Sequence, residues 1–290
     1  MRKNNLFHLP ILNRALLRDL FLFNASLGIY RFLKGIDYVR SIEFPVIIDA
    51  ILKRRNEPLS YLDIGSGNSI LPTYVATHSS FRVTVIDRYR WISDQIKYLM
   101  RLGKEHYLFK KRFVMLKDDF IKNKSLQNES FDIITAVSVL EHMENNGDSE
   151  AVAKIHRLLK PEGILLLTAP YNHFNHLKFY VNKSVYGQSL GPKGFFYQRH
   201  YNTDALANRI LNVASFHVEA LFYCGHYDNF NFAKHLYMLP TPLKGIKIFY
   251  NWAAPFYAPY FMKLSYKPPY EQKPGKSTAD TVFVFMKKIG

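Results

Sequence analysis

The sequence predicts an α/β protein built around a mostly parallel sheet. Short apolar runs rich in β-branched residues recur between positions 59 and 169, and segments with helical spacing of apolar residues lie between them. Gly, Pro and Asp mark most of the turns. Strands that alternate with helices in this way pair in parallel through right-handed crossovers, with helices on both faces. At 290 residues the chain can bury a large core.

The first predicted strand ends in a turn that can hold a ligand. It carries Asp63 near its end and turns at once on Gly65, Ser66 and Gly67. Glycines permit a tight turn and let a ligand approach the backbone closely, and open α/β sheets bind ligands at this position. A dinucleotide fingerprint needs a third glycine where Ile70 stands, and Asp63 would repel a pyrophosphate. The turn therefore favours a small cationic cofactor over NAD.

Helical patterns precede this strand, and further elements follow it. We expect a helical cap over residues 1–57, because apolar residues recur at steps of three and four along 11–34 and again near 44–52. The remaining chain, 58–290, is expected to form the main domain. Within it the sequence predicts strands at 59–64, 81–87, 112–116, 131–137 and 164–169, and helices at 71–77, 91–102 and 148–159.

Acids stand at the ends of the second and third predicted strands. Asp87 closes the second strand, and its two carboxylate oxygens can accept hydrogen bonds from both hydroxyls of a ribose. Asp118, Asp119 and Phe120 follow the third strand. These acids suit either an adenine amino group, with Phe120 covering the ring, or the capping of a short helix. The predicted ligand site therefore extends beyond the glycine turn.

With these residues in place, the segment from Tyr61 to Pro170 resembles the cofactor-binding core of the class I S-adenosylmethionine-dependent methyltransferases, close to the branch that methylates small molecules and lipid quinones. The resemblance rests on the acids and glycines above and on the segments 131–134, 140–142 and 158–163. It implies a Rossmann-like, seven-stranded, mostly parallel sheet whose last strand is antiparallel, with S-adenosylmethionine as the cofactor. The end of that fold is matched by a helix at 203–213 and strands at 216–223 and 281–286.

The resemblance also implies which residues hold the cofactor. The glycine turn and Ser138 would lie beside the methionine part, the acid after the second strand on the ribose, and the acids after the third strand on the adenine. The cofactor-binding residues implied in this way are Asp63, Gly65, Ser66, Gly67, Asp87, Arg88, Asp118, Asp119, Phe120 and Ser138.

Methyl transfer makes limited demands on catalytic groups. The sulfonium of S-adenosylmethionine is a good leaving group, so the protein must chiefly hold a nucleophile in line and exclude water. A base is needed only where the acceptor carries a proton that must leave. His142 is the candidate base, and Glu141 is the candidate for orienting it. The alternative is that His142 caps local structure or shapes the pocket.

Two insertions, 171–202 and 225–280, depart from the family pattern, and such insertions usually build the acceptor pocket in this family. Glycines in the first insertion suggest a mobile lid. Its predicted acceptor-binding residues are Tyr197, Arg199, His200 and Tyr201, with Arg199 on an acidic group. His173 and His176 are spaced like metal ligands on a helix, but no third ligand accompanies them, so no metal is expected.

The second insertion mixes aromatic residues with lysines. This composition suits a membrane interface or a lid over an apolar acceptor, stacking on RNA bases, or packing against the sheet. The insertion contains no Arg, which is the residue favoured in nucleic-acid recognition. A lipid or another apolar partner is therefore preferred over RNA.

Composition sets the remaining expectations. The net charge of +16 lies mainly in residues 1–60 and 181–290, and such flanks suit acidic lipids, nucleic acid or plain solvation. Cys224 is the single cysteine, which excludes an intramolecular disulfide and favours a reducing compartment. We expect a cytoplasmic methyltransferase, with peripheral contact at a membrane surface as an option, that modifies an O, N or C centre of a small-molecule or lipid-like acceptor. The open alternatives are an RNA methyltransferase and a catalytically silent protein that binds the cofactor or a partner.

Overall fold

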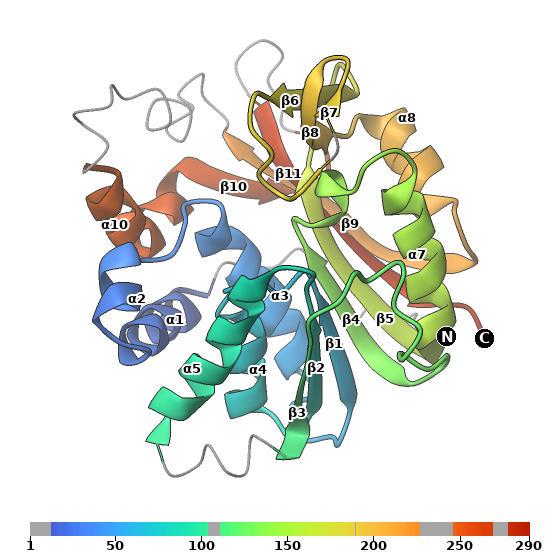
Figure 1. Cartoon of the computed structure of the whole chain (residues 1–290). Coiled ribbons are helices and arrows are strands. Elements are labelled where there is room, and N and C mark those ends of the chain that lie inside the picture. The colour runs from blue at the N-terminus through green and yellow to red at the C-terminus, as the bar shows by residue number, and fades with distance from the viewer. Residues whose placement is uncertain (1–12, 104–110, 189, 227–245, 269–277) are drawn as a thin grey trace.

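A computed structural model describes residues 13–103, 111–188, 190–226, 246–268 and 278–290. Its centre is an eight-stranded sheet in the order β10-β9-β11-β5-β4-β1-β2-β3, seen edge-on in Figure 1. Strands β1 to β5 pair in parallel, and β11 inserts antiparallel between β5 and β9. The strands are β1 (Ser60–Ile64), β2 (Arg82–Ile86), β3 (Phe113–Leu116), β4 (Phe131–Val137), β5 (Leu159–Pro170), β9 (Phe216–His226), β10 (Met262–Ser265) and β11 (Thr278–Lys288).

The structure confirms the mostly parallel sheet and the antiparallel last strand, but the expected strand number of seven is wrong. The eighth strand, β10, comes from the second insertion and pairs antiparallel with β9, where Met262 lies opposite His226. An exposed strand edge presents unpaired backbone groups, and β10 satisfies those of β9. The composition of the insertion gave no signal for this short strand.

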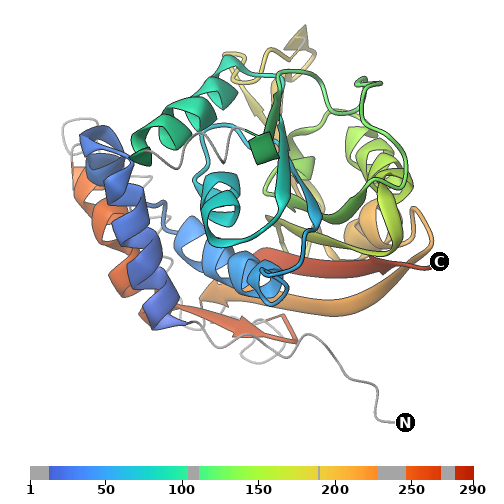
Figure 2. The same cartoon turned by 90° about the horizontal axis from the view of Figure 1, so that it is seen from below.

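Helices cover both faces of the sheet (Figures 1 and 2). The alternation along β11 shows why, since Phe283 and Phe285 belong to one apolar cluster and Val282 and Val284 to the other. A strand that is apolar on both sides must be covered on both sides. One face carries α3 (Arg40–Leu52), α4 (Leu71–His78) and α5 (Asp94–Arg101), and the other carries α7 (Gly147–Leu158), α8 (Thr203–Leu206) and the π-helix Ala207–Leu211.

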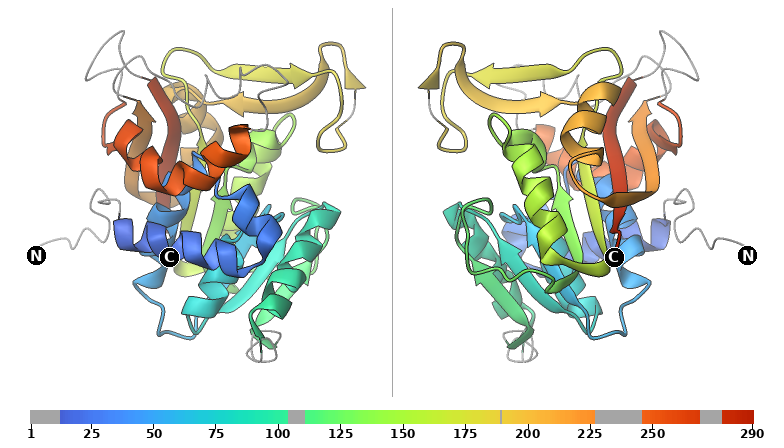
Figure 3. Two further views of the ribbon diagram at one scale, coloured as in Figure 1. Left: turned by 90° about the vertical axis from the view of Figure 1, so that its left-hand side faces the viewer. Right: turned by 90° about the vertical axis from the view of Figure 1, so that its right-hand side faces the viewer.

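The helix expected along residues 11–34 is two helices, α1 (Arg14–Ser26) and α2 (Ile29–Lys34). Gly28 separates them with a φ of 112°, which an α-helix does not permit. Both pack against α10 (Ile246–Phe261), the helix of the second insertion, so segments more than 200 residues apart form one layer (Figures 2 and 3). Among the described residues no helix is both long and apolar enough to cross a membrane.

The first insertion folds into a small antiparallel sheet of β6 (Leu177–Val181), β7 (Leu190–Gly191) and β8 (Gly194–His200). This sheet lies across the carboxyl end of the large parallel sheet (Figure 3). It returns to β5 through Tyr201, whose backbone N–H donates to the Pro170 carbonyl at 3.0 Å. The insertion is therefore placed over the edge at which open α/β sheets bind ligands.

Candidate functional site

A cavity of about 950 Å³ lies at the carboxyl ends of β1, β2 and β4. Its walls come from the glycine turn after β1, the segments after β2, β3 and β4, the α2–α3 segment, and residues 186–188 of the first insertion. All ten residues implied to bind the cofactor lie on these walls, together with His142. The sequence separates these groups widely, and the parallel sheet brings them together.

The turn after β1 has a backbone that only glycine adopts easily. Gly65 and Gly67 have φ values of 67° and 48°, in the left-handed region. A Cβ on Gly65 would lie 2.5 Å from a methyl carbon of Val139, far inside van der Waals contact. The Gly67 N–H donates to Oδ2 of Asp87 at 2.9 Å, and the Tyr89 N–H donates to Oδ1 at 2.8 Å. The turn and the acid after β2 therefore fix one another.

Asp63 forms the floor of the cavity and is almost completely buried. Its carboxylate accepts hydrogen bonds from Thr135 and Tyr61, while the Ser66 hydroxyl donates to its carbonyl at 2.8 Å. Burial raises the pKa of Asp63 to about 6, because charge is costly away from water. A cationic ligand above this carboxylate would favour its ionised form, which makes Asp63 a fitting anchor for an ammonium group.

The acids after β3 serve the local backbone and also line the cavity. Asp119 Oδ1 accepts from the backbone N–H groups of Ile121 and Lys122 at 2.9 and 3.2 Å. Asp118 Oδ2 accepts from the side chain of Asn123 at 2.7 Å. Residues 117–130 form turns and no helix, so Asp119 caps a local turn and not the short helix expected from the sequence. The position of both acids on the cavity wall remains compatible with ligand contact.

His142 lies at the end of the 3₁₀ turn Leu140–His142 and faces the cavity. Its Nδ1 is 2.7 Å from the Tyr197 carbonyl, so Nδ1 carries the proton and donates. Its Nε2 then has a free lone pair and lies 3.7 Å from the Glu141 carboxylate. Burial lowers the pKa of His142 to about 4, so the ring is neutral at physiological pH.

Glu141 does not orient this ring in the expected way. Its side chain is buried, and burial raises its pKa to about 8, which keeps the carboxyl protonated near neutral pH. The distance of 3.7 Å to His142 is too long for a hydrogen bond. The carbonyl of Tyr197, a residue of the first insertion, orients the imidazole instead. The two residues are 55 positions apart in the sequence, so local spacing does not indicate this contact.

The helix α3 adds a polar cluster that the sequence analysis missed. The Ser138 hydroxyl donates to Glu43 Oε1 at 3.0 Å and accepts from Arg40 Nη1 at 2.7 Å, and Arg40 also forms an ion pair with Glu43. Glu43 is fully buried, and Ser138 has a φ of 49°, an uncommon backbone for serine. The one available signal was an acid within the apolar run of α3. The N-terminal segment therefore forms part of the cavity wall.

A second missed group closes the cavity from the first insertion. The Tyr186 carbonyl accepts hydrogen bonds from Arg88 and from the Tyr89 hydroxyl, which ties the insertion to the segment after β2. The Tyr186 ring lies 4.7 Å from the His142 ring and is stacked with Tyr197, with ring centroids 6.0 Å apart. The rings of Tyr186 and Tyr197 thus lie beside the candidate base.

The structure places the four predicted acceptor-binding residues differently from the expectation. Arg199 and Tyr201 are buried, and both bind Asp148, whose Oδ2 accepts from each at 2.9 Å. The side chain of His200 contacts Gln198 and the ring of Phe179. None of these residues is on the cavity wall, and Tyr197 reaches the site through its carbonyl and its contacts with His142 and Tyr186.

Arg199 is therefore better explained as a structural residue than as an acceptor ligand. Its guanidinium also donates to the Met143 and Asn145 carbonyls, and Asp148 further accepts from Arg209 at 2.6 and 2.8 Å. Burying a charge requires such pairing. β8 has an irregularity at Tyr197, where its pairing with β6 shifts register, so Phe196 and Arg199 are both buried and in contact although they are three residues apart. Arg199 thereby reaches Asp148 of α7 and does not line the cavity.

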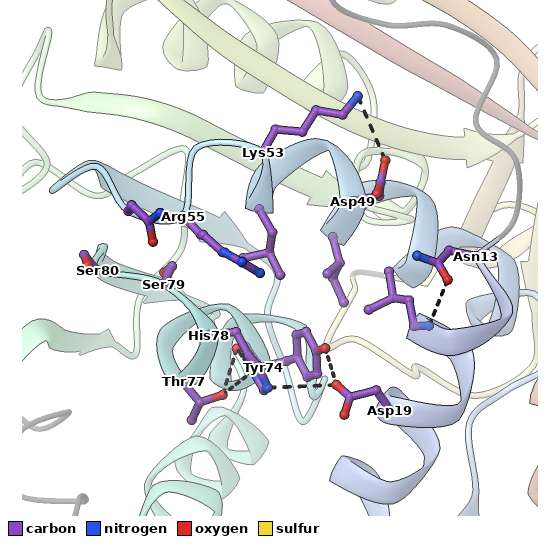
Figure 4. A pocket seen from close by; sticks show the side chains of 14 residues that line it. Asn13, Asp19, Asp49, Lys53, Arg55, Tyr74, Thr77, His78, Ser79 and Ser80 are labelled. Atoms are coloured by element: carbon purple, nitrogen blue, oxygen red, sulfur yellow. Dashed lines mark hydrogen bonds and ion pairs between the residues drawn. The ribbon is translucent and has the colours of Figure 1, made fainter.

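A second hollow, of about 680 Å³, lies between α1, α3 and α4, at the amino ends of β1 and β2 (Figure 4). Tyr74 donates to Asp19, and its ring stacks on His78 with centroids 4.0 Å apart. This hollow is on the opposite edge of the sheet from the glycine turn. Across the described residues, no group of three or more His, Cys, Asp or Glu side chains is placed to hold a metal ion.

The glycine turn, the acid after β2 and the acids after β3, on a sheet with one antiparallel strand next to β5, define the class I methyltransferase fold. The sequence matches the family model for the methyltransferase domain over residues 41–223. This match covers more than half of the chain. The chain therefore belongs to the methyltransferases, in the class I, S-adenosylmethionine-dependent group.

Solved structures agree with this assignment at the level of the fold. One similar structure is the 1,6-didemethyltoxoflavin-N1-methyltransferase of Burkholderia thailandensis, with its substrate and S-adenosylhomocysteine bound (15% identity, TM-score 0.52, covering 98% of this chain and 94% of that chain). Coclaurine N-methyltransferase, bound to N-methylheliamine and S-adenosylhomocysteine, is also similar (14%, 0.52, 92% and 78%). So is the [4+2]-cyclase SpnF (16%, 0.51, 88% and 84%). No curated protein sequence matches the chain significantly.

Proposed function

We propose that this methyltransferase transfers the methyl group of S-adenosylmethionine to an O, N or C centre of a small-molecule or lipid-like acceptor bound in the cavity. The observation that carries the proposal is the size of the cavity. The cavity of about 950 Å³ is at the upper end of the range for ligand pockets, which leaves room for a cofactor and a second small molecule. Its walls come from the segments that follow β1 to β4, from the α2–α3 segment and from the first insertion.

The residues on one side of the cavity fit the cofactor. The Asp87 carboxylate, already held by two backbone N–H groups, has further lone pairs for ribose hydroxyls. Asp63 supplies negative charge for the ammonium group, and the bare glycine turn admits a close approach to the backbone. Phe120 and Asp118 would serve the adenine. When bound, S-adenosylmethionine supplies an electrophilic methyl group on a sulfonium.

Further residues of the cavity wall suit the acceptor. Arg31, Lys34 and Arg40 form a basic wall there, while His142 and Tyr186 provide an aromatic one. Burial lowers the pKa values of Arg31 and Lys34, so an anionic group on the acceptor would be favoured at this wall. This basic wall takes the role that the sequence analysis gave to Arg199.

His142 is proposed as the group that receives the acceptor's proton. Its Nδ1–H is committed to the Tyr197 carbonyl, so the lone pair on Nε2 is available to an acceptor hydroxyl or amine. Its lowered pKa keeps it neutral but makes it a weak base. An acceptor that loses its proton as the methyl group arrives fits such a base.

Calorimetry with S-adenosylmethionine tests the cofactor site directly. We expect binding by the wild-type protein and an affinity loss of at least about 100-fold in Asp87→Ala, since two charge-assisted hydrogen bonds contribute about 1.5–3 kcal/mol each. Asp204→Ala, which removes an exposed acid on α8, is the matched control. A folded wild-type protein that fails to bind, or an Asp87→Ala variant that binds like the control, would refute the proposal.

Acceptor identity requires a separate experiment. Metabolites and lipids are compared with and without the gene, and pairs that differ by one methyl group are sought. Candidates are then incubated with the purified enzyme and isotopically labelled S-adenosylmethionine. Label found only in RNA would contradict a small acceptor, and cofactor binding without any labelled product would favour the silent alternative.

A further inference from the structure

The layer formed by α1, α2 and α10 exposes many large apolar side chains. The three helices lie together on one side of the molecule (Figures 2 and 3). The exposed fractions are Leu22 54%, Ile29 72%, Tyr30 65%, Leu33 51%, Phe249 73%, Phe256 50% and Tyr260 62%. We call these seven residues the apolar face. A soluble monomer rarely exposes so many large apolar side chains on one layer without a functional reason.

These residues form one surface because the helices pack together. Phe21 of α1 contacts both Trp252 and Phe256 of α10, with ring centroids 5.6 and 5.1 Å apart. Phe32 of α2 contacts Trp252 at 6.0 Å. Residues 249, 256 and 260 share one face of α10 by helical spacing. These ring contacts, between Phe21, Phe32, Trp252 and Phe256, hold the three helices that carry the exposed side chains in one layer.

The charges on this layer are mostly positive. Arg14 lies over the Tyr260 ring at 5.1 Å, and Arg18 is exposed one turn further along α1. Lys34 ends α2 and Lys263 follows α10. The exposed acid on α1, Asp19, forms a hydrogen bond with Tyr74 on the side that faces α4. Basic side chains bordering exposed aromatic rings complement an anionic lipid surface.

From this geometry we infer that the apolar face docks on an anionic lipid bilayer. The aromatic and aliphatic side chains enter the interfacial region, and the arginines and lysines contact the headgroups. Docking of this kind needs no membrane-spanning helix. The net charge of +16 draws the protein to such a surface before the apolar side chains insert.

The docking surface adjoins the cavity. Gly35 at the end of α2 packs so closely on Asn251 of α10 that a Cβ there would overlap the backbone. Arg31, Lys34 and Gly35 line the cavity, while their neighbours on α2 belong to the apolar face. This adjacency makes a membrane-resident amphiphile with an anionic group the favoured acceptor class. That choice of acceptor rests on the proposed function.

Vesicle flotation tests the docking without any catalytic readout. The full chain is mixed with phosphatidylcholine vesicles that contain or lack phosphatidylglycerol. We expect flotation with the anionic vesicles, weaker at high salt, and at least about a tenfold loss of partitioning in the triple variant Ile29→Ser, Leu33→Ser, Phe249→Ser. Arg18→Ala should lose about fivefold, which corresponds to about 1 kcal/mol per basic residue at the surface.

Matched controls separate the docking surface from general apolarity and charge. Met100→Ser, Leu190→Ser and Ile289→Ser remove three comparably exposed apolar side chains from other elements, and Arg157→Ala removes an exposed arginine on α7. Absence of flotation, or equal losses in the test and control variants, would overturn the inference. So would light scattering that shows a dimer abolished by the triple variant, with no binding to vesicles. Calorimetry with S-adenosylmethionine on the same variants keeps failure of docking distinct from failure of the proposed function.

Discussion

Replacing Arg199 with Met separates a structural role for this residue from an acceptor-binding one. The side chain is 1% exposed and pairs with Asp148, which is itself fully buried. Methionine keeps most of the volume, so the change removes chiefly the charge and the hydrogen bonds. Asp148 retains Tyr201 and Arg209, but the Met143 carbonyl loses its donor.

The magnitude follows from what remains unpaired. The loss of one charge-assisted hydrogen bond costs about 1.5–3 kcal/mol, and a buried carbonyl without a donor costs about 1–3 kcal/mol. Removing one partner of a buried ion pair costs about 3–5 kcal/mol, and the surviving bonds to Asp148 favour the lower end. We expect Arg199→Met to lower the free energy of unfolding by about 3 kcal/mol, or Tm by roughly 6–12 °C.

Urea denaturation and thermal scans measure this loss, and calorimetry measures cofactor affinity on the same protein. Lys193→Met, which removes an exposed cation from the turn between β7 and β8, is the control and should leave stability unchanged within about 0.5 kcal/mol. The affinity for S-adenosylmethionine should not change, because Arg199 is not on the cavity wall. Wild-type stability combined with a raised KM for an acidic acceptor would refute this reasoning.

Three further predictions concern the cavity. Burial raises the folded-state pKa of Glu141 from 4.5 to about 8, so the folded protein holds this proton more tightly and its stability falls as pH rises from about 4.5 to 8. Glu141→Gln should therefore gain stability relative to wild type across this window, by up to about 5 kcal/mol in pH-dependent denaturation. Parallel stability curves for the two proteins would contradict this prediction. For acceptors that lose a proton, His142→Gln should lower kcat by about 100-fold. The wild-type rate should fall only below about pH 5, since burial lowers the pKa of His142 to about 4. A fall in rate centred near pH 6.5 would instead show a histidine with an ordinary pKa. Gly65→Ala should weaken cofactor binding at least about tenfold, because its Cβ would lie 2.5 Å from Val139 and its φ is 67°, whereas Gly103→Ala, with open space around its Cβ, should leave that affinity intact.

The sequence alone determined the fold class and the grouping of the residues expected to hold the cofactor on one cavity wall. Strand and helix periods are local properties, and the carboxyl ends of parallel strands must meet at one edge of the sheet. Asp63, Asp87 and Asp118 can therefore be grouped from the sequence alone, because each lies at or just after the end of a strand that the pattern identifies. Their individual contacts with a cofactor stay predictions.

Only the tertiary structure decided which other side chains line the cavity. Arg199 and Arg40 are both basic residues on amphipathic elements, and the sequence does not show which one faces the cavity. The ion pair with Asp148 of α7 holds Arg199 in the core, while α3 brings Arg40 to Ser138, 98 residues away. In the same way α1 and α10 become one surface through contacts between distant segments. Such contacts depend on how whole elements pack, and local periodicity carries no information about that packing.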